Sequence, residues 1–367
     1  MHNNVMGERD MRNEQDGRKI GMAVIGYGGM GSHHANKVRS QRPGKFDVIG
    51  TFDIREERQQ AAREKGFQAF ESREALLGDP RIELVVVATP NDVHKEIVID
   101  ALRHGKNVIC EKPVTMTTPD LEDMIAVANE TGQFFTVHRN RRWDPDYRTA
   151  KEIIESNTLG RVFNIESRVH GSRGIPGDWR NQKEHGGGMV LDWGIHMLDQ
   201  MLQLMGDRRL LSLYAQLTFI TNEECDDGFR VICNFEGGTC YIVEILTNNF
   251  INLPRWYING ENGTAIVRDW SRKGEIVKVS NWENRDSVPI QAGVGITKTM
   301  APRTKKTIKK YPLPKPKSDW MEYYDNIYDV IRNGAPPIVT HDQQRRLIRL
   351  CEAIFESGET GKAIELE

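Results

Sequence analysis

The sequence lacks any long apolar run. No stretch approaches the roughly 18 consecutive apolar residues that a membrane-spanning helix requires. Residues 1–17 are mainly polar and charged and contain no apolar segment of the kind found in a secretory signal. We therefore expect these residues to form a loose tail and the protein to be cytoplasmic.

Paired cysteines are also missing. The five cysteines are odd in number, and no two of them have C-x-x-C spacing. The spacing of Cys225, Cys233 and Cys240 does not match a zinc module. We expect reduced, mostly buried thiols and no metal site.

A strong charge of either sign is absent as well. The formal net charge is -2, which gives no electrostatic reason to expect nucleic acid or an anionic membrane as a partner. Residues 298–317 are locally basic, contain proline and hold no acidic residue. We interpret this segment as a solvated loop or linker, and the alternative is a patch that binds an anion or a partner.

What the sequence does contain is enough chain for two or more domains. Its 367 residues exceed the roughly 150 typical of one domain. Between about residues 18 and 138, short apolar runs alternate with helical segments of about ten residues. Strands are expected at 19–25, 46–52, 83–88, 107–110 and 134–137, and helices at 33–40, 56–65, 93–103 and 119–130. This alternation predicts βαβ units and an α/β fold with a doubly wound parallel sheet.

The remainder of the chain has a different pattern. Helices are expected at 147–156 and 188–205, and strands at 162–170, 211–219, 228–235, 239–247, 256–259 and 264–268. Strands in series with glycine or asparagine turns predict a mostly antiparallel sheet with helices on one face, an α+β domain over residues 139–340. The amphipathic segment 341–357 predicts a final helix, and we expect residues 341–367 to pack back towards the first domain.

A glycine-rich loop follows the first expected strand and opens the first helix. Gly26 would make the tight turn, Gly28 would let the backbone approach phosphates, and Gly31 would let helix and strand pack closely. The helix N-terminus adds free N–H groups and partial positive charge. The loop therefore predicts a dinucleotide site that includes Gly26, Gly28, Gly29, Met30 and Gly31.

An acidic residue stands at the end of the second strand, about twenty residues beyond the loop. The carboxylate of Asp53 can accept hydrogen bonds from both adenosine ribose hydroxyls and would repel a 2′-phosphate, which favours NAD over NADP. Ile54 and Arg55 are expected beside it, although Arg55 and Arg58 are cations that would weaken the preference. The alternative is that Asp53 caps the helix that follows.

The tripeptide Glu111-Lys112-Pro113 ends the fourth expected strand. Ligands of doubly wound folds bind outside the carboxyl ends of the strands, so Lys112 would point into the site. A lysine there can donate a hydrogen bond to a substrate oxygen, or act as a base if its pKa is lowered. The alternative is a surface lysine on a turn.

A second segment with candidate catalytic residues runs from Gly186 to His196. If it is helical, Asp192 and His196 are four residues apart on one face, and a carboxylate beside an imidazole fixes its tautomer and raises its basicity. The three glycines that precede them permit close approach of the backbone to a ligand. The alternative is an ordinary surface pair. Asp199 shares the helix face, but hydride transfer needs no metal.

Taken together, these motifs resemble the glucose–fructose oxidoreductase / inositol dehydrogenase family (Gfo/Idh/MocA). The resemblance rests on the glycine loop, on Thr89-Pro90-Asn91 with His94, on Glu111-Lys112-Pro113 and on the segment from Gly186 to His196, and it covers residues 19–364. It implies an N-terminal Rossmann domain joined to a C-terminal domain with a large open sheet. It also implies cofactor contacts from Thr89, Pro90, Asn91, His94, Glu111 and Lys112.

The family pattern also implies roles in catalysis and in substrate binding. Lys112 would polarise the alcohol oxygen, Asp192 would orient His196 and contact the substrate, and His196 would accept the proton. Further substrate contacts are implied for Arg141, Trp143, Asp178, Trp179 and Arg180. Their polar and aromatic character suits a sugar, although Arg141 can equally be a structural ion-pair partner.

We therefore expect an NAD-dependent dehydrogenase that oxidises a secondary hydroxyl of a sugar or glycoside. The expected position is C3 of a glucoside, which gives a 3-oxo-glycoside. The alternatives are an inositol 2-dehydrogenase and, outside enzymes, an NAD-binding sensor. The resemblance further implies a homo-oligomer built through the open sheet, with a small-molecule sugar as the ligand and neither nucleic acid nor membrane as a partner.

Overall fold

The chain forms two compact units. A computed structural model describes residues 18–284 and 288–366; the tail expected at residues 1–17 lies outside them. The first unit contains the described chain up to Asn140, together with Gly177–Ile195 and Asp319–Glu352. The second contains Arg141–Pro176, His196–Ser318 and the chain from Ala353 onwards. Each unit is therefore assembled from separate stretches of sequence.

The first unit is built on a six-stranded parallel sheet in the order β3-β2-β1-β4-β5-β6. Its strands are β1 (Ile20–Ile25), β2 (Phe46–Phe52), β3 (Gln68–Ala69), β4 (Leu84–Val87), β5 (Asn107–Cys110) and β6 (Phe135–Val137). Every residue of β1 and β4 is buried, as expected for central parallel strands covered on both faces. The predicted doubly wound fold is confirmed.

Helices connect these strands. They are α2 (Gly29–Gln41), α3 (Glu56–Glu64), α4 (Arg73–Leu77), α5 (His94–Arg103) and α6 (Thr118–Thr131). The first unit also includes α9 (Glu322–Asn333) and the start of α10 (His341–Thr360). The rings of Tyr324 and Tyr328 on α9 meet Phe46 of β2 edge-on, and Arg345 on α10 pairs with Glu122 of α6 at 2.7 Å. Helices α9 and α10, which come late in the chain, thus complete the core of the first unit.

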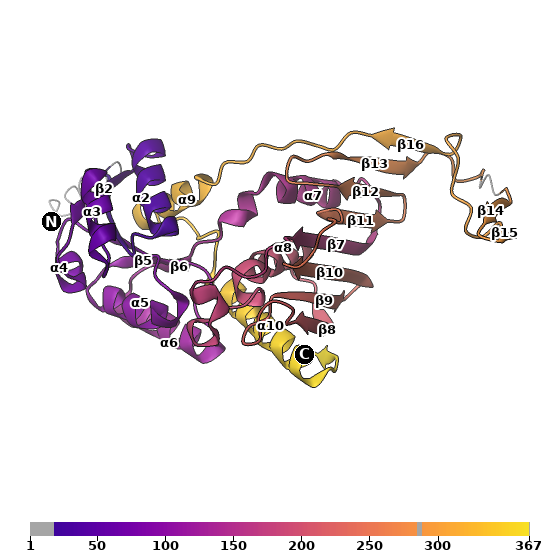
Figure 1. Cartoon of the computed structure of the whole chain (residues 1–367). Helices are drawn as coiled ribbons and strands as arrows, with labels where there is room; N and C mark the ends of the chain where they lie inside the picture. Colours follow the sequence, from indigo (N-terminus) through magenta and orange to yellow (C-terminus); the bar gives the residue numbers. More distant parts are fainter. Residues whose placement is uncertain (1–17, 285–287, 367) are drawn as a thin grey trace, which may run out of the picture. The chain divides into compact units, whose positions relative to one another are not determined.

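The second unit carries a nine-stranded sheet in the order β16-β13-β12-β11-β7-β10-β9-β8-β17 (Figure 1). Its strands are β7 (Val162–His170), β8 (Leu210–Thr218), β9 (Gly228–Phe235), β10 (Thr239–Leu246), β11 (Trp256–Gly260), β12 (Gly263–Val267), β13 (Gly274–Val279), β16 (Ile308–Tyr311) and β17 (Ile364–Glu365). Only the β7–β10 pairing is parallel, so the predicted mostly antiparallel sheet is confirmed.

One face of this sheet is buried. Alternate residues of β10, including Tyr241, Val243 and Ile245, have almost no exposed surface. Helix α7 (Pro145–Glu155) contributes Asp146, whose carboxylate accepts hydrogen bonds from Arg255 at 2.6 Å and from the indole N–H of Trp256 at 2.8 Å. Both bonds go to Oδ2 of a carboxylate that has no exposed surface.

Two local expectations were wrong. The segment 298–317 is not wholly a loop, because Ile308–Tyr311 forms β16 and pairs with β13. The helix expected from Gly188 is not regular, because Val190–Gly194 forms a π-helical turn and α8 starts at Ile195 and ends at Met205. A separate hairpin, β14 (Ile290–Ala292) with β15 (Gly295–Thr297), was not anticipated.

The five cysteines are free thiols, four of them buried, as expected. Within residues 18–284 and 288–366, no helix has both the length and the apolar character to cross a membrane.

Candidate functional site

The glycine loop joins β1 to α2 in the first unit. Gly26 has a φ of +92°, and a Cβ there would lie 2.4 Å from the carbonyl oxygen of Ala88. A Cβ on Gly31 would lie 1.7 Å from the carbonyl oxygen of Gly26. Both positions therefore require glycine for the backbone to fold as it does.

Gly28 and Gly29 differ from those two glycines. A Cβ at either position would meet nothing within 4 Å, so the space beside them is open. Gly28 is the N-cap of α2, no side chain caps the helix, and its first turn holds no acidic residue. Free amide groups at an uncapped helix N-terminus with open space beside them fit the pyrophosphate of a dinucleotide.

Asp53 lies at the end of β2 and is nearly buried. Its carboxylate accepts a hydrogen bond from the backbone N–H of Tyr27 in the glycine loop at 2.7 Å, and a second from the N–H of Arg55 at 2.9 Å. It is not the N-cap of α3, because that position is Arg55. A carboxylate has about four acceptor sites, so Asp53 can tie down the loop and still accept ribose hydroxyls.

The chain after β4 holds the next set of predicted contacts. The buried ring of His94 lies between two carbonyl oxygens, with Nδ1 2.9 Å from Pro113 and Nε2 3.0 Å from Thr89. His94 thereby joins the loop after β4 to the loop after β5. The side-chain amide of Asn91 donates to the carbonyl oxygen of Gly186 at 3.2 Å. This bond connects the glycine run, residues 186–188, to the segment that follows β4.

The glycine run itself has a structural purpose that the sequence did not indicate. Gly186 and Gly188 have positive φ. A Cβ on Gly186 would lie 2.7 Å from the sulfur of Met116, and one on Gly187 would lie 2.3 Å from the carbonyl oxygen of Arg180. The absence of a side chain at Gly186 and Gly187 therefore lets the chain pack closely against Met116 and the backbone of Arg180.

Lys112 and Asp192 meet within the first unit. The ammonium group of Lys112 lies 2.9 Å from Oδ1 of Asp192 and 2.9 Å from its backbone carbonyl oxygen. Burial alone would raise the pKa of Asp192, but the charges of Lys112 and Arg180 bring that pKa below its ordinary value. Asp192 is therefore ionised at neutral pH, and it stands in a π-helical turn, a feature often found at functional sites.

Arg180 extends this ion pair. Its Nε lies 3.5 Å from the other carboxylate oxygen of Asp192, and its NH1 donates to Asp178 at 2.8 Å. The guanidinium stacks over the ring of Trp179, with its carbon 4.5 Å from the ring centroid. The structure thus brings together Lys112, Asp192, Arg180, Asp178 and Trp179.

Three other predicted residues belong to the second unit. Arg141 pairs with Asp144 at 2.9 Å, and Trp143 is buried with its carbonyl oxygen accepting a hydrogen bond from Ser318. His196 is buried in the first turn of α8. The adjacent Arg142 forms a bidentate ion pair with Asp199: its Nε lies 2.8 Å from Oδ2 and its NH2 lies 2.6 Å from Oδ1.

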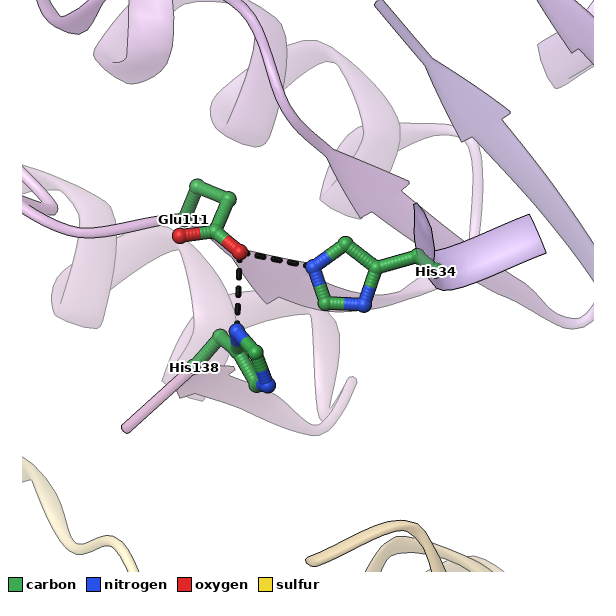
Figure 2. A group of neighbouring side chains, drawn as sticks. All are labelled: His34, Glu111 and His138. Carbon is green, nitrogen blue, oxygen red and sulfur yellow. Dashed lines mark hydrogen bonds and ion pairs between the residues drawn. The ribbon is translucent and has the colours of Figure 1, made fainter. Parts of the chain in front are cut away.

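Glu111 is turned into the protein rather than towards solvent. Its Oε1 lies 2.6 Å from Nε2 of His34 and 2.8 Å from Nδ1 of His138 (Figure 2). Nδ1 of His34 lies 2.5 Å from the hydroxyl of Tyr324, and the backbone N–H of Lys112 donates to Oε2 of Glu111 at 3.1 Å. All three side chains in Figure 2 are buried.

Comparison with known families identifies the chain. Residues 20–139 match the model described as the oxidoreductase family with an NAD-binding Rossmann fold, and residues 147–266 match the GFO/IDH/MocA C-terminal domain. The chain belongs to the Gfo/Idh/MocA family. It is accordingly an NAD-binding oxidoreductase, which confirms the dinucleotide site predicted from the glycine loop and the activity implied by the family resemblance.

Solved and curated relatives agree with this membership. An NAD-binding protein from Listeria innocua has 46% identity and a TM-score of 0.91, over 95% of this chain and 100% of that one. The scyllo-inositol 2-dehydrogenase (NADP(+)) IolW of Bacillus subtilis is 29% identical, over 80% of this chain and 82% of its own. The myo-inositol 2-dehydrogenase of Thermotoga maritima is 23% identical, over 94% and 98%.

Sequence reasoning on this Gfo/Idh/MocA chain missed two residues of the site. His34 and Tyr324 were not singled out, yet they are linked to Glu111, whose buried carboxylate was expected beside the cofactor. A histidine on the inner face of the helix that opens at the glycine loop was an available signal for His34. No short-range signal pointed to Tyr324, because it lies 290 residues further along the chain.

Proposed function

We propose that this oxidoreductase oxidises a secondary hydroxyl of a sugar or glycoside, with C3 of a glucoside as the favoured position and a 3-oxo-glycoside as the product. The observation that carries the proposal is the Lys112–Asp192 ion pair, which follows β5 in the unit that contains the glycine loop. Doubly wound folds bind their ligands outside the carboxyl ends of the strands.

In this proposal, Lys112, Asp192 and His196 act together. NAD, when bound, would supply the acceptor for the hydride of the alcohol carbon. An ammonium group has three N–H donors, and two contacts of Lys112 go to Asp192, so one donor is available for the substrate oxygen. His196 takes the hydroxyl proton, and Asp192, four residues earlier in the chain, orients its ring.

The cofactor would be held by the residues around the glycine loop. Gly28 and Gly29 would face the pyrophosphate, Asp53 the adenosine ribose, and the segment from Thr89 to His94 the nicotinamide half. Asp53 favours NAD over NADP because a second negative charge beside it is unfavourable.

A sugar is the substrate class that the side chains near Lys112 suit best. Asp178 and Arg180 offer hydrogen-bond acceptors and donors, and the partly exposed Trp179 offers aromatic surface for a sugar ring. An inositol is the second candidate, because two relatives are named as inositol 2-dehydrogenases. The two candidates differ in whether the substrate carries an aglycone.

The test is an oxidation assay with methyl glucosides, an aryl glucoside, myo-inositol and scyllo-inositol, each with NAD⁺ and with NADP⁺. We expect the glucosides to be oxidised faster than either inositol, with NMR of the product locating the ketone at C3. Faster oxidation of an inositol would replace the glycoside proposal with its alternative.

The catalytic set is tested by Lys112→Met and His196→Ala, which should lower kcat/KM by about a thousandfold while NAD binding persists. Rates that remain within about twofold of the wild type in both variants would remove the proposed mechanism. Tight NAD binding with no oxidation of any substrate would favour the sensor.

We also propose that the protein is a homo-oligomer built through the open face of the second unit's sheet. Directly paired residues form a partly exposed row across that face, made of Tyr214, Ile232, Ile242, Glu166, Tyr257 and Ile266. Five of these six side chains are apolar or aromatic, and a second copy of the same face would cover them.

A further inference from the structure

We propose that Glu111 is a positioning residue for Lys112, held in place by His34 and His138, with Tyr324 fixing the ring of His34. This inference rests on the proposed function, in which Lys112 contacts the substrate hydroxyl. Glu111 itself need not touch the substrate.

The first step of the argument is the number of elements that one carboxylate connects. Its Oε1 receives hydrogen bonds from His34 on α2 and from His138 just after β6 (Figure 2). Its Oε2 accepts the backbone N–H of Lys112. The backbone that carries Lys112 is therefore fixed to two neighbouring elements of the first unit.

The second step concerns where the hydrogens lie. A carboxylate only accepts hydrogen bonds, so Nε2 of His34 and Nδ1 of His138 must both carry hydrogen. Burial lowers the pKa of His34, which keeps its ring neutral. Nδ1 of His34 then accepts a hydrogen bond from the hydroxyl of Tyr324, so Tyr324 selects the tautomer that donates to Glu111.

The third step is the charge of the cluster. Burial would raise the pKa of Glu111, but His138 and His34 hold that pKa well below its ordinary value. An ionised carboxylate forms stronger hydrogen bonds than a neutral one. The backbone N–H of Lys112 thus has a fixed and charged acceptor across the working pH range.

A metal ion at the same three side chains is the competing interpretation. Their ligand atoms lie within 4.8 Å of one another. However, the nitrogens lie 2.6 and 2.8 Å from Oε1, and these are hydrogen-bond lengths. A zinc ligand atom would be bare and about 2.0–2.2 Å from an ion. The direct bonds already satisfy the carboxylate, so we infer a hydrogen-bonded clamp.

The main test is Glu111→Gln, with Glu130→Gln as the matched control because Glu130 is exposed at the end of α6. A glutamine has only one acceptor oxygen, so it cannot serve the histidines and Lys112 together. We expect kcat to fall about tenfold or more, because small misplacements of a reacting group are costly, with KM changed less than about threefold.

A second readout does not depend on turnover. Amide hydrogen exchange of a peptide that contains Lys112 should become faster in Glu111→Gln and remain unchanged in Glu130→Gln. NAD affinity by calorimetry should remain within about threefold of the wild type, because both carboxylate oxygens of Glu111 are bonded within the protein and the amide groups of the glycine loop are intact. If exchange and kcat both match the wild type, the positioning role is overturned.

A milder variant keeps the inference testable if Glu111→Gln does not fold. Tyr324→Phe removes one hydroxyl and should lower kcat about threefold or more, whereas Tyr328→Phe on the same helix should leave it unchanged. Equal rates in the two variants would overturn the role of Tyr324.

Two outcomes separate this inference from the proposed function. If the wild type oxidises a sugar and Lys112→Met abolishes oxidation, but Glu111→Gln behaves as the wild type, only the positioning role fails. If the wild type oxidises no sugar while exchange at Lys112 still responds to Glu111→Gln, the proposed function fails and the clamp stands. About one equivalent of zinc in the purified protein, lost in Glu111→Gln, would overturn the clamp.

Discussion

At the scale of single residues, Asp53 has a structural task and, in the proposed function, a binding task as well. Its two oxygens hold the backbone of Tyr27 and of Arg55, so the carboxylate both shapes the glycine loop and fixes the end of β2. The residue type follows from both tasks, because only a carboxylate accepts on both oxygens and also repels a phosphate.

We predict that Asp53→Asn weakens NAD⁺ binding about tenfold and reduces the discrimination against NADP⁺. Asparagine has one acceptor oxygen in place of two and carries no charge. Calorimetric titration with both cofactors measures the effect. Unchanged affinity for NAD⁺ together with unchanged selectivity would contradict the ribose assignment.

Asp192 gives a prediction in terms of pH. Its pKa in the folded protein lies below the ordinary value, so its ion pair stabilises the fold above about pH 3.9 and is lost as the pH falls through the folded-state pKa. Asp192→Asn should therefore cost about 2 kcal/mol at neutral pH. The difference from the wild type should shrink in acid below the ordinary Asp pKa.

The measurement for Asp192→Asn is chemical unfolding at neutral pH and again in acid. A difference that stays constant over this range would show that the ionised form of Asp192 does not carry the stabilisation.

At the scale of elements, the loop between β1 and α2 contains two kinds of glycine. Some are required by close backbone packing, and others border open space beside the helix N-terminus. Gly31 faces the backbone of Gly26 too closely for any side chain, whereas Gly28 faces open space. One loop therefore offers two substitutions of the same chemical size with different consequences.

We predict that Gly28→Ala folds normally but binds NAD⁺ about tenfold more weakly, because its Cβ would occupy the space beside the helix N-terminus. Gly31→Ala should lower the free energy of unfolding by about 3 kcal/mol or more, since backbone must move. Thermal unfolding and calorimetry distinguish the two. Equal stability in both variants would contradict this division.

Several helices and strands could be predicted from local sequence patterns, and others could not. Apart from the two-residue β3, the strands from β1 to β12 and most of the longer helices were expected within a few residues, because apolar periodicity and glycine stops are local signals. Helix α9 was missed although Tyr323, Ile327 and the terminal Gly334 mark it. Strand β16 was read as linker because its lysines dominate the composition, while its pairing with β13 is a distant contact.

The candidate site divides in the same way. Lys112, Asp192 and the glycine loop stand in recognisable segments, so sequence could name them. Arg180 was named, but its ion pair with Asp192 depends on how the chain folds between the two residues. The π-helical turn at Val190–Gly194 has no short sequence signature and was expected as a regular helix.

At the scale of the whole molecule, assembly gives the next prediction. Ile242 lies in the middle of the partly exposed row on the open sheet face, between Ile232 and Glu166. We predict that Ile242→Asp reduces the proposed oligomer to a smaller species, because a buried charge at the centre of the proposed interface is costly. Light scattering coupled to size exclusion measures the mass.

The control for Ile242→Asp is Ile338→Asp, which places the same charge on an exposed residue of the first unit. That variant should keep the wild-type mass. An unchanged mass in Ile242→Asp, or an equal change in both variants, would contradict assembly through this face.

The division of the first unit into separate stretches has a consequence for biosynthesis. The ribosome releases the six strands of its sheet long before residues 319–352, yet Phe46 packs on Tyr324 and Tyr328, and His34 binds Tyr324. A nascent chain that has not reached α9 therefore displays uncovered apolar surface and an incomplete histidine cluster. Such intermediates are targets for chaperones, and release of residues 319–352 is the moment at which this nucleotide-binding unit can close its core.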